Sequence, residues 1–157
     1  MINVTRSLEL EEFAREGRRR FEAADTAWFE QTTAFGEVSS FGTAPEEQAR
    51  GRDDVLALTT DQIGEMNEAA GLDIAAPDND SDDHELIEAY QAGDAGWIIT
   101  HGRFTFDDGS WVANRIVNVV IREPDGSGWK SVLTTSQLLV PNELLSDGSP
   151  LRSAAEA

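Results

Sequence analysis

The spacing of apolar residues changes once along this chain of 157 residues, and that change limits most strongly what the chain can fold into. Up to about residue 70, apolar side chains recur every three or four positions, as they do in amphipathic helices. From residue 72 they alternate with polar ones, as in strands whose two faces have different surroundings. Helices followed by neighbouring strands predict an α+β fold with a mainly antiparallel sheet.

Capping residues mark where the first helices begin. Ser7 is placed to cap a helix over 7–24, and Asp25 is placed to cap a short second helix. Residues 32–41 are mixed in character and predict an irregular strand.

Two more helices are predicted before the strands. Thr43 to Glu46 have the spacing of a capping box with proline in the first turn, which predicts a short helix that ends at Gly51. Asp53 or the next residue is placed to cap a longer helix that runs to about Ala70.

Turn residues divide the second half of the chain into five strands. Most of the breaks combine glycine with aspartate or proline, as hairpin turns do. The predicted strands are 72–76, 84–91, 95–106, 111–122 and 129–140. We expect residues 7–141 to form one domain, between an N-terminal tail over 1–6 and a flexible tail over 142–157.

The turn after residue 106 decides which side chains share a face. A two-residue turn at Asp108 and Gly109 would pair Phe106 with Trp111. A three-residue loop over 107–109, with Gly109 left-handed in a bulge, would instead place His101 opposite Arg115. We favour the second arrangement because glycine stands where the bulge needs it.

The charge balance excludes several kinds of partner. The chain has 30 acidic and 12 basic side chains, which gives a formal net charge of −18. Nucleic acid and anionic membranes are bound through clustered lysine and arginine, so neither is expected as a partner. The charge is uneven, because residues 31–94 hold sixteen acidic and two basic side chains, whereas 95–140 hold four of each.

The absence of some residue types and segments excludes further classes of protein. The chain has no cysteine, which excludes disulfides and thiolate chemistry. No segment resembles a signal peptide, and no apolar run is long enough for a membrane span, so we expect a cytoplasmic protein.

Three segments resemble the same family. Residues 41–53 resemble the segment GT-x-P-E-E-x-x-x-G-R-D of SnoaL-like domains, and residues 93–97 resemble their G-D-x-A-W start of a long strand. Arg115, with the residues that follow it to Trp129, is similar to the last hairpin of that family. The resemblance covers about residues 8–141 and implies the nuclear transport factor 2-like, ketosteroid isomerase-like superfamily.

This resemblance implies a cone-shaped fold, in which a strongly curved sheet wraps around helices and encloses a cavity that opens at one end. It also implies a homodimer, because dimers through the outer face of the sheet are common in the superfamily. Members include isomerases, cyclases, dehydratases, hydrolases and domains without catalysis, so the fold does not decide the function.

Two residues on the long strands are candidates for chemistry. His101 titrates near neutral pH and could act as an acid or base. Arg115 resembles an arginine in the association domain of calcium/calmodulin-dependent kinase II, and could hold a carboxylate through two parallel hydrogen bonds. Each also has a structural interpretation, as a hydrogen-bonded wall histidine or as an arginine paired with a helix carboxylate. The predicted lining of the cavity comprises Trp28, Phe29, Trp97, Ile99, His101, Trp111, Arg115, Thr135 and Gln137.

The chain departs from its relatives at several positions. Ile99 stands where the kinase domain has a further cavity arginine, and Thr135 and Gln137 stand where the family's last strand has His and Ser. Ketosteroid isomerase chemistry needs a carboxylate base inside the cavity and tyrosine and acidic donors. The chain has a single tyrosine, Tyr90, and no acidic residue on its two longest central strands.

Metal and cofactor chemistry is not expected. The acidic run over 78–83 begins like a calcium loop, but it lacks the glycine at position six and the glutamate at position twelve. No cluster of His, Asp and Glu has metal-ligand spacing, and no glycine-rich loop follows a strand.

Three hypotheses for the function follow. The first is a binding domain without catalysis, for a small and partly apolar ligand that carries an anionic group. The second is an isomerase, cyclase, dehydratase or hydrolase that uses His101 as acid or base and Arg115 to stabilise an anion. The third is a dimerisation module whose cavity is vestigial.

Overall fold

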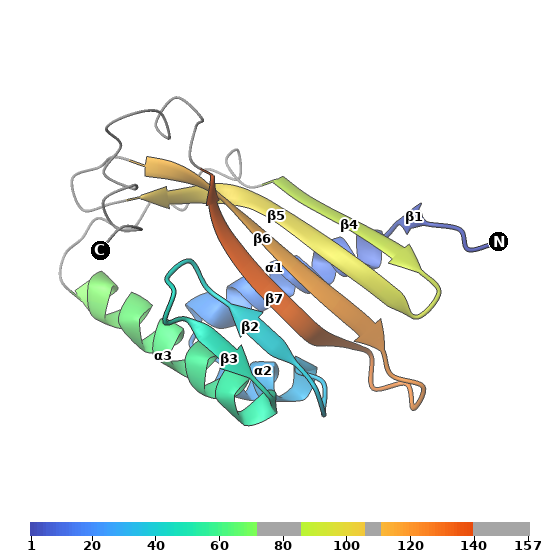
Figure 1. Cartoon of the computed structure of the whole chain (residues 1–157), viewed down its shortest axis with the longest axis horizontal. Helices are drawn as coiled ribbons and strands as arrows, with labels where there is room; N and C mark the ends of the chain where they lie inside the picture. Colours follow the sequence, from blue (N-terminus) through green and yellow to red (C-terminus); the bar gives the residue numbers. More distant parts are fainter. Residues whose placement is uncertain (72–85, 106–110, 140–157) are drawn as a thin grey trace.

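A computed structural model describes residues 1–71, 86–105 and 111–139 of the chain (Figure 1). Three helices and seven strands make up these parts. They are β1 Thr5–Arg6, α1 Leu8–Glu22, α2 Thr26–Thr32, β2 Ser39–Phe41, β3 Gln48–Arg50, α3 Arg52–Gly71, β4 Leu86–Ala92, β5 Ala95–Thr105, β6 Trp111–Arg122 and β7 Trp129–Leu139. The predicted α+β class is confirmed.

All seven strands belong to one sheet, in the order β1-β4-β5-β6-β7-β2-β3. Neighbouring strands pair antiparallel, except that β2 runs parallel to β7. In Figure 1 the long helix α1 lies behind β4 to β7, and α3 lies near the β2–β3 hairpin. The helices pack on different strands, because α1 contacts β4 and β5, α2 contacts β7, and α3 contacts β2 and β3.

The N-caps predicted at Ser7 and Asp25 are confirmed, whereas the one predicted at Asp53 or Asp54 is wrong, because α3 begins at Arg52 and both aspartates lie in its first turn. The hydroxyl of Ser7 accepts a hydrogen bond from the backbone N–H of Leu10 at 3.3 Å. The carboxylate of Asp25 accepts one from the N–H of Trp28 at 3.2 Å. These bonds satisfy N–H groups that have no partner within the helix, so each helix begins where its capping residue stands.

The strand meander follows its prediction closely. The four observed strands β4 to β7 begin or end within two residues of the predicted bounds, and β6 matches them at both ends. The predicted pairing of His101 with Arg115 is confirmed. The loop over 107–109, the strand predicted at 72–76 and the tail over 142–157 lie outside the described residues.

The short helix predicted over 43–51 is wrong. The backbone turns at this point and returns as β3, which pairs antiparallel with β2. The Glu47 carboxylate does bond back, to the N–H of Ala44 at 2.9 Å, and the N–H of Gly42 donates to the carbonyl of Glu47 at 2.7 Å. The capping-type contact therefore closes a hairpin instead of starting a helix, because the two short strands pair on either side of it.

Part of the segment predicted as an N-terminal tail belongs to the sheet, because Thr5 and Arg6 pair with β4 at its edge. Arg6 also donates to the carboxylate of Glu11 at 2.6 Å, and Glu11 is buried. The hydrogen bond from Arg6 holds the pKa of the Glu11 carboxyl below its usual range. This ion pair therefore keeps a charge at the junction of β1, α1 and β4 compensated.

The hydrophobic core lies between α1 and the part of the sheet that α1 covers. Leu10 of α1 and Val120 of β6 are both fully buried in it. The buried cluster consists of Leu10, Ile87, Ala89, Ile98, Val120 and Trp129, with Phe13 and Ala14 packed against it. The core fixes which side of the sheet faces the helices.

Candidate functional site

Contacts with α1 identify the inner face of the sheet. A Cβ atom at Gly96 would lie 2.4 Å from Leu10 Cδ1, so the helix rests directly on this position. Ile98 is buried against the same leucine, and Gly96 pairs with Val120. Because side chains alternate along a strand, the register assigns every other residue of β4 to β7 to this side. The inner face comprises Ile87, Ala89, Gln91, Gly96, Ile98, Thr100, Gly102, Val112, Asn114, Ile116, Asn118, Val120, Arg122, Trp129, Ser131, Thr134, Ser136 and Leu138.

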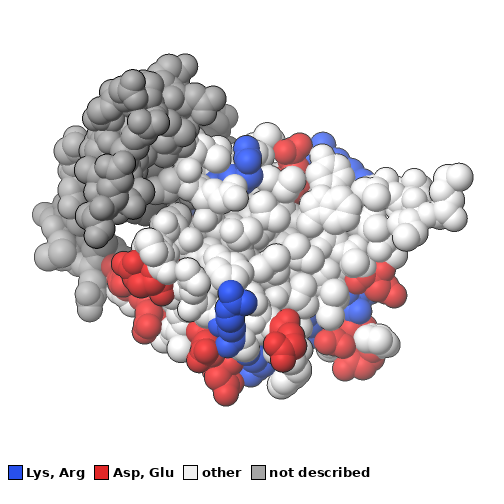
Figure 2. Space-filling model, in the orientation of Figure 1, with Lys and Arg blue, Asp and Glu red and all other residues white. Residues whose placement is uncertain are grey.

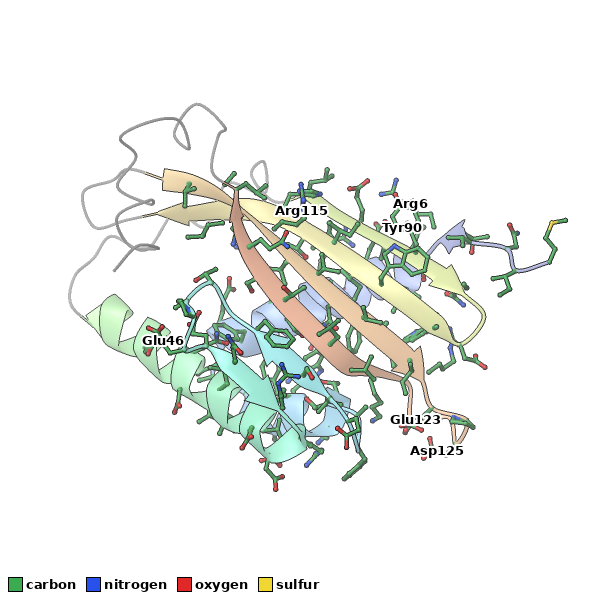
Figure 3. All side chains as sticks on the ribbon, viewed as in Figure 1. Arg6, Glu46, Tyr90, Arg115, Glu123 and Asp125 are labelled. Atoms are coloured by element: carbon green, nitrogen blue, oxygen red, sulfur yellow. The ribbon has the colours of Figure 1, made fainter. Side chains whose placement is uncertain are left out.

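The opposite side, which we call the outer face, turns away from α1 and toward the viewer in Figures 1 to 3. It is built from the other residues of the same four strands. The outer face comprises Leu86, Glu88, Tyr90, Ala92, Ala95, Trp97, Ile99, His101, Ala113, Arg115, Val117, Val119, Ile121, Lys130, Leu133, Thr135, Gln137 and Leu139, and the backbone register also places positions Arg103, Thr105 and Trp111 on this side.

This assignment corrects the predicted cavity lining. Six of the predicted residues, on β5, β6 and β7, face away from the helices and so cannot line a cavity beneath them. They are Trp97, Ile99, His101, Arg115, Thr135 and Gln137. The physical reason is that α1 approaches β5 so closely that only Gly96 fits beneath Leu10, which leaves the larger neighbours on the other side. Whether these residues bind a ligand from the outer side stays a prediction.

The other predicted lining residues lie away from these six. Trp28 packs on Phe13 at 5.4 Å between ring centroids, and Phe29 meets Phe21 edge-on at 6.0 Å. These contacts hold α2 against α1 and explain both aromatic residues by packing. The backbone of Trp111 pairs with Thr105, and the placement of its side chain lies outside what the structure describes.

Three polar side chains, those of Glu88, His101 and Tyr90, form a cluster on the outer face. His101 Nε2 lies 3.4 Å from one carboxylate oxygen of Glu88, and the Tyr90 hydroxyl lies 3.4 Å from the other. The Tyr90 ring stacks on Trp97 with 5.9 Å between centroids. Arg115 stands beside His101 on the next strand, and Figure 3 shows Tyr90 and Arg115 along the same part of the face. The sequence-predicted acid–base residue therefore has a carboxylate partner, on an open sheet surface.

Sequence reasoning missed a polar patch on the inner face. The Ser131 hydroxyl donates to Asn118 Oδ1 at 2.8 Å and lies 3.4 Å from the Thr134 hydroxyl. Further along β6, the carboxamide of Asn114 lies against Gly102, where a Cβ would be 2.9 Å from its oxygen. All four polar side chains are half-buried. Alternation of asparagine with aliphatic residues over 114–118 was the available signal, but it needed the inner face to be known.

The chemistry of the inner face is that of amides and hydroxyls. Within the described parts of β4 to β7, its ionisable residue is Arg122, at the far end of β6. Arg122 stacks on Trp129 at 4.5 Å and donates to Glu9 at 2.8 Å, so it closes the core end of the sheet. An inner face without carboxylate, imidazole or amine groups can bind and orient a ligand, but it offers no acid or base.

An open groove lies elsewhere, between the end of α2 and the β6–β7 hairpin, and Glu30, Phe35 and Asp125 contribute to its lining. Hydrogen bonds from Ser127 hold the pKa of Asp125 below its usual range, so this carboxylate serves the hairpin turn. In the part of the chain that the structure describes, no three His, Asp or Glu side chains come together as metal ligands. His84 and the acidic run over 78–83 lie outside that part.

Membrane crossing by a helix can be judged from the helices that the structure describes. None of them combines the length and the apolar composition that such a crossing requires.

Comparison with known proteins gives the fold. No family model matches this chain, and no curated protein matches it. Among solved structures, it is similar to an NTF2-like protein of unknown function from Pseudomonas putida, with 15% identity and a TM-score of 0.57 over 88% of this chain and 93% of that one.

Two other similar structures carry provisional descriptions. One, from Thiobacillus denitrificans, is provisionally described as a calcium/calmodulin-dependent protein kinase type II association domain, with 20% identity and a TM-score of 0.56 over 88% of this chain and 99% of that one. The other, from Parabacteroides distasonis, is provisionally described as a ketosteroid isomerase, with 15% identity and a TM-score of 0.52 over 83% and 87%. At these identities the likeness shows the fold alone, and the chain has the NTF2-like, cystatin-like fold.

Proposed function

We propose that this chain is a SnoaL-like small-molecule-binding domain whose ligand lies on the inner face of β5 to β7. The observation that carries the proposal is the half-buried set of amides and hydroxyls at Thr100, Asn114, Asn118, Ser131 and Thr134. Polar side chains in such a place are retained at a cost in stability unless they are hydrogen-bonded, and a ligand would supply partners for them.

The same residues indicate the class of ligand. Asparagine and threonine side chains donate to and accept from carbonyl and hydroxyl groups, but they do not neutralise a charge. Ile116 stands between the two asparagines and offers an apolar surface. We therefore propose an uncharged, partly apolar ligand that carries carbonyl or hydroxyl oxygens, which replaces the anionic group that the sequence led us to expect at Arg115.

A thermal-shift screen tests this proposal. Cyclic ketones and lactams should raise the melting temperature, whereas carboxylates of matched size should not, because the cation of the described inner face, Arg122, lies at its far end and is already paired with Glu9. A ligand at one hundred times its Kd stabilises by about 2.7 kcal/mol, which such a screen resolves. Asn118→Leu should abolish the shift, and Arg115→Gln on the outer face should keep it. The reverse pattern, with carboxylates bound through Arg115, would disprove the proposal.

A second proposal, that the outer face joins two copies of this chain, is supported by its uncharged centre. Although the chain has a net charge of −18, Figure 2 shows a broad uncharged surface over β5 to β7, with the carboxylates gathered around its rim. Ile99, Val117 and Val119 are half-buried at its centre, and Ile121 at its edge is exposed. Contiguous apolar surface rimmed by polar residues is typical of a protein interface.

A charge placed in the middle of this face should separate the copies. We expect sedimentation velocity to show a dimer at micromolar concentration for the unaltered chain and a monomer for Val117→Asp, because an unpaired carboxylate would be buried between the sheets. Ala57→Asp adds the same charge on the exposed side of α3 and should leave the dimer intact. A Val117→Asp protein that remains dimeric would exclude this face.

A further inference from the structure

Glu88 and Arg115 stand on the outer face at the border of its uncharged surface. Glu88 is the only carboxylate on this side of the described parts of β4 to β7, and Arg115 is the arginine nearest to it in the register. Glu88 lies one strand to one side of β5, and Arg115 lies one strand to the other side. In Figure 2 the charged side chains near Arg115 stand at the upper border of the uncharged surface.

Neither charge is fully compensated within one copy. In the described ranges of the chain, no carboxylate contacts Arg115. Glu88 is contacted by His101 and Tyr90, each at 3.4 Å, which is long for hydrogen bonds to a carboxylate. In an interface, both groups would lose water, and burying an unpaired charge costs several kcal/mol.

Within one copy, the backbone positions of Glu88 and Arg115 lie well apart. They are separated by two strand spacings, about 10 Å, and by two residues along the strands, about 7 Å. The two side chains form no ion pair with each other in the described structure, and partners from a second copy would compensate both charges in a buried interface.

Two-fold symmetry supplies that completion. In an isologous interface, if residue i of one copy meets residue j of the other, then j also meets i. The two-fold axis of two sheets packed face to face lies in the plane between them. An axis that crosses β5 between His101 and Ile99 and runs diagonally over β6 toward Val119 exchanges the positions of Glu88 and Arg115.

We infer that Arg115 of each copy binds Glu88 of a second copy of this chain, so that the dimer contains this ion pair twice. The inference rests on the proposed dimer and specifies its geometry. The same axis brings His101, Ile99, Val117 and Val119 close to their own symmetry mates, so the apolar centre of the face lies along the axis, to one side of the two ion pairs.

Cysteine cross-linking tests the inference directly, because the chain has no cysteine of its own. Facing sheets stand about 10 Å apart, which is too far for a disulfide, so a short bis-maleimide serves as the cross-linker. An equimolar mixture of Glu88→Cys and Arg115→Cys proteins should give cross-linked dimer with this reagent, whereas each variant alone should give much less. If the mixture gave no more cross-linked dimer than either variant alone, the inference would be overturned.

Charge reversal gives an independent measurement. Arg115→Glu and Glu88→Arg should each weaken the dimer about a hundredfold or more, because like charges would then meet at two symmetric places. The double variant should restore dimerisation, and circular dichroism should show that all three variants are folded. Weakening by both single changes without restoration in the double variant would overturn the pairing.

The controls separate this inference from the proposal beneath it. An unaltered chain that is monomeric by sedimentation would overturn the proposed dimer, and the ion pair with it. A dimer that Val117→Asp dissociates, but that shows no cross-linking between positions 88 and 115, would retain the interface and overturn only this pairing.

Discussion

Gly96→Val is expected to lower the free energy of unfolding by about 3 kcal/mol, because β5 has no room for a side chain beneath α1. Even a Cβ atom would lie 2.4 Å from Leu10 Cδ1 and 2.9 Å from the carbonyl oxygen of Tyr90. The leucine could rotate away, but the carbonyl belongs to the neighbouring strand and moves only with the sheet. Urea denaturation, with the slope checked for two-state behaviour, measures the change.

Gly64 provides the matched control for that substitution. It lies in α3, is exposed, and has no atom within 4 Å of where a Cβ would stand. Gly64→Ala should therefore stabilise the chain by up to about 1 kcal/mol, since alanine favours the helix. If Gly96→Ala were equally harmless, the close packing of α1 on β5 would be disproved.

Leu10→Ala is expected to lower the free energy of unfolding by about 3 kcal/mol, because it would leave a cavity in the core. Leu10 is fully buried and lies at the centre of the cluster that joins α1 to β4, β5 and β6. Leu8 in the same helix is 71% exposed, so Leu8→Ala should change the stability by less than about 0.5 kcal/mol. Thermal unfolding of the two variants in parallel gives the comparison.

The two sites should also be coupled. Leu10→Ala removes the atom that a Cβ at position 96 would meet first, so Gly96→Ala should cost less in the Leu10→Ala chain than in the unaltered one. Strictly additive effects in the double-mutant cycle would show that the two residues do not share a contact.

Much of the fold could be predicted because its signals are local. Ser7 and Asp25 cap helices through bonds to residues three positions away. The glycine and aspartate turns and the period of two set the limits of β5, β6 and β7, and turn geometry gave the register of His101 against Arg115. Each of these depends on neighbours within a few residues or on one hairpin.

The choice of inner and outer face could not be made in the same way. Both sides of β5 carry apolar residues, with Trp97 and Ile99 on one and Ile98 on the other. What decides between them is the approach of α1 to Gly96, a contact between segments more than eighty residues apart. Large and titratable residues seemed suited to a cavity lining, but where α1 crosses β5 there is room only for Gly96.

The misassigned helix at 43–51 has a related cause. Its glutamate makes the expected bond to a backbone N–H, but β2 finds a parallel partner in β7, which lies about ninety residues later in the chain. The capping-type motif therefore closes the β2–β3 hairpin, because the pairing of β2 with β7 decides the local structure.

The position of β7 in the sheet bears on how the molecule is assembled during synthesis. Strands from the first fifty residues occupy both borders of the sheet, whereas its centre comes from residues 86–139. A ribosome therefore delivers the borders first, and β2 waits for its neighbour until β7 has emerged. Because pairing between such distant segments is slow, the early strands remain open to wrong partners until the last one arrives. The dense acidic charge of residues 31–94 would then act during this interval, by keeping unfinished chains apart.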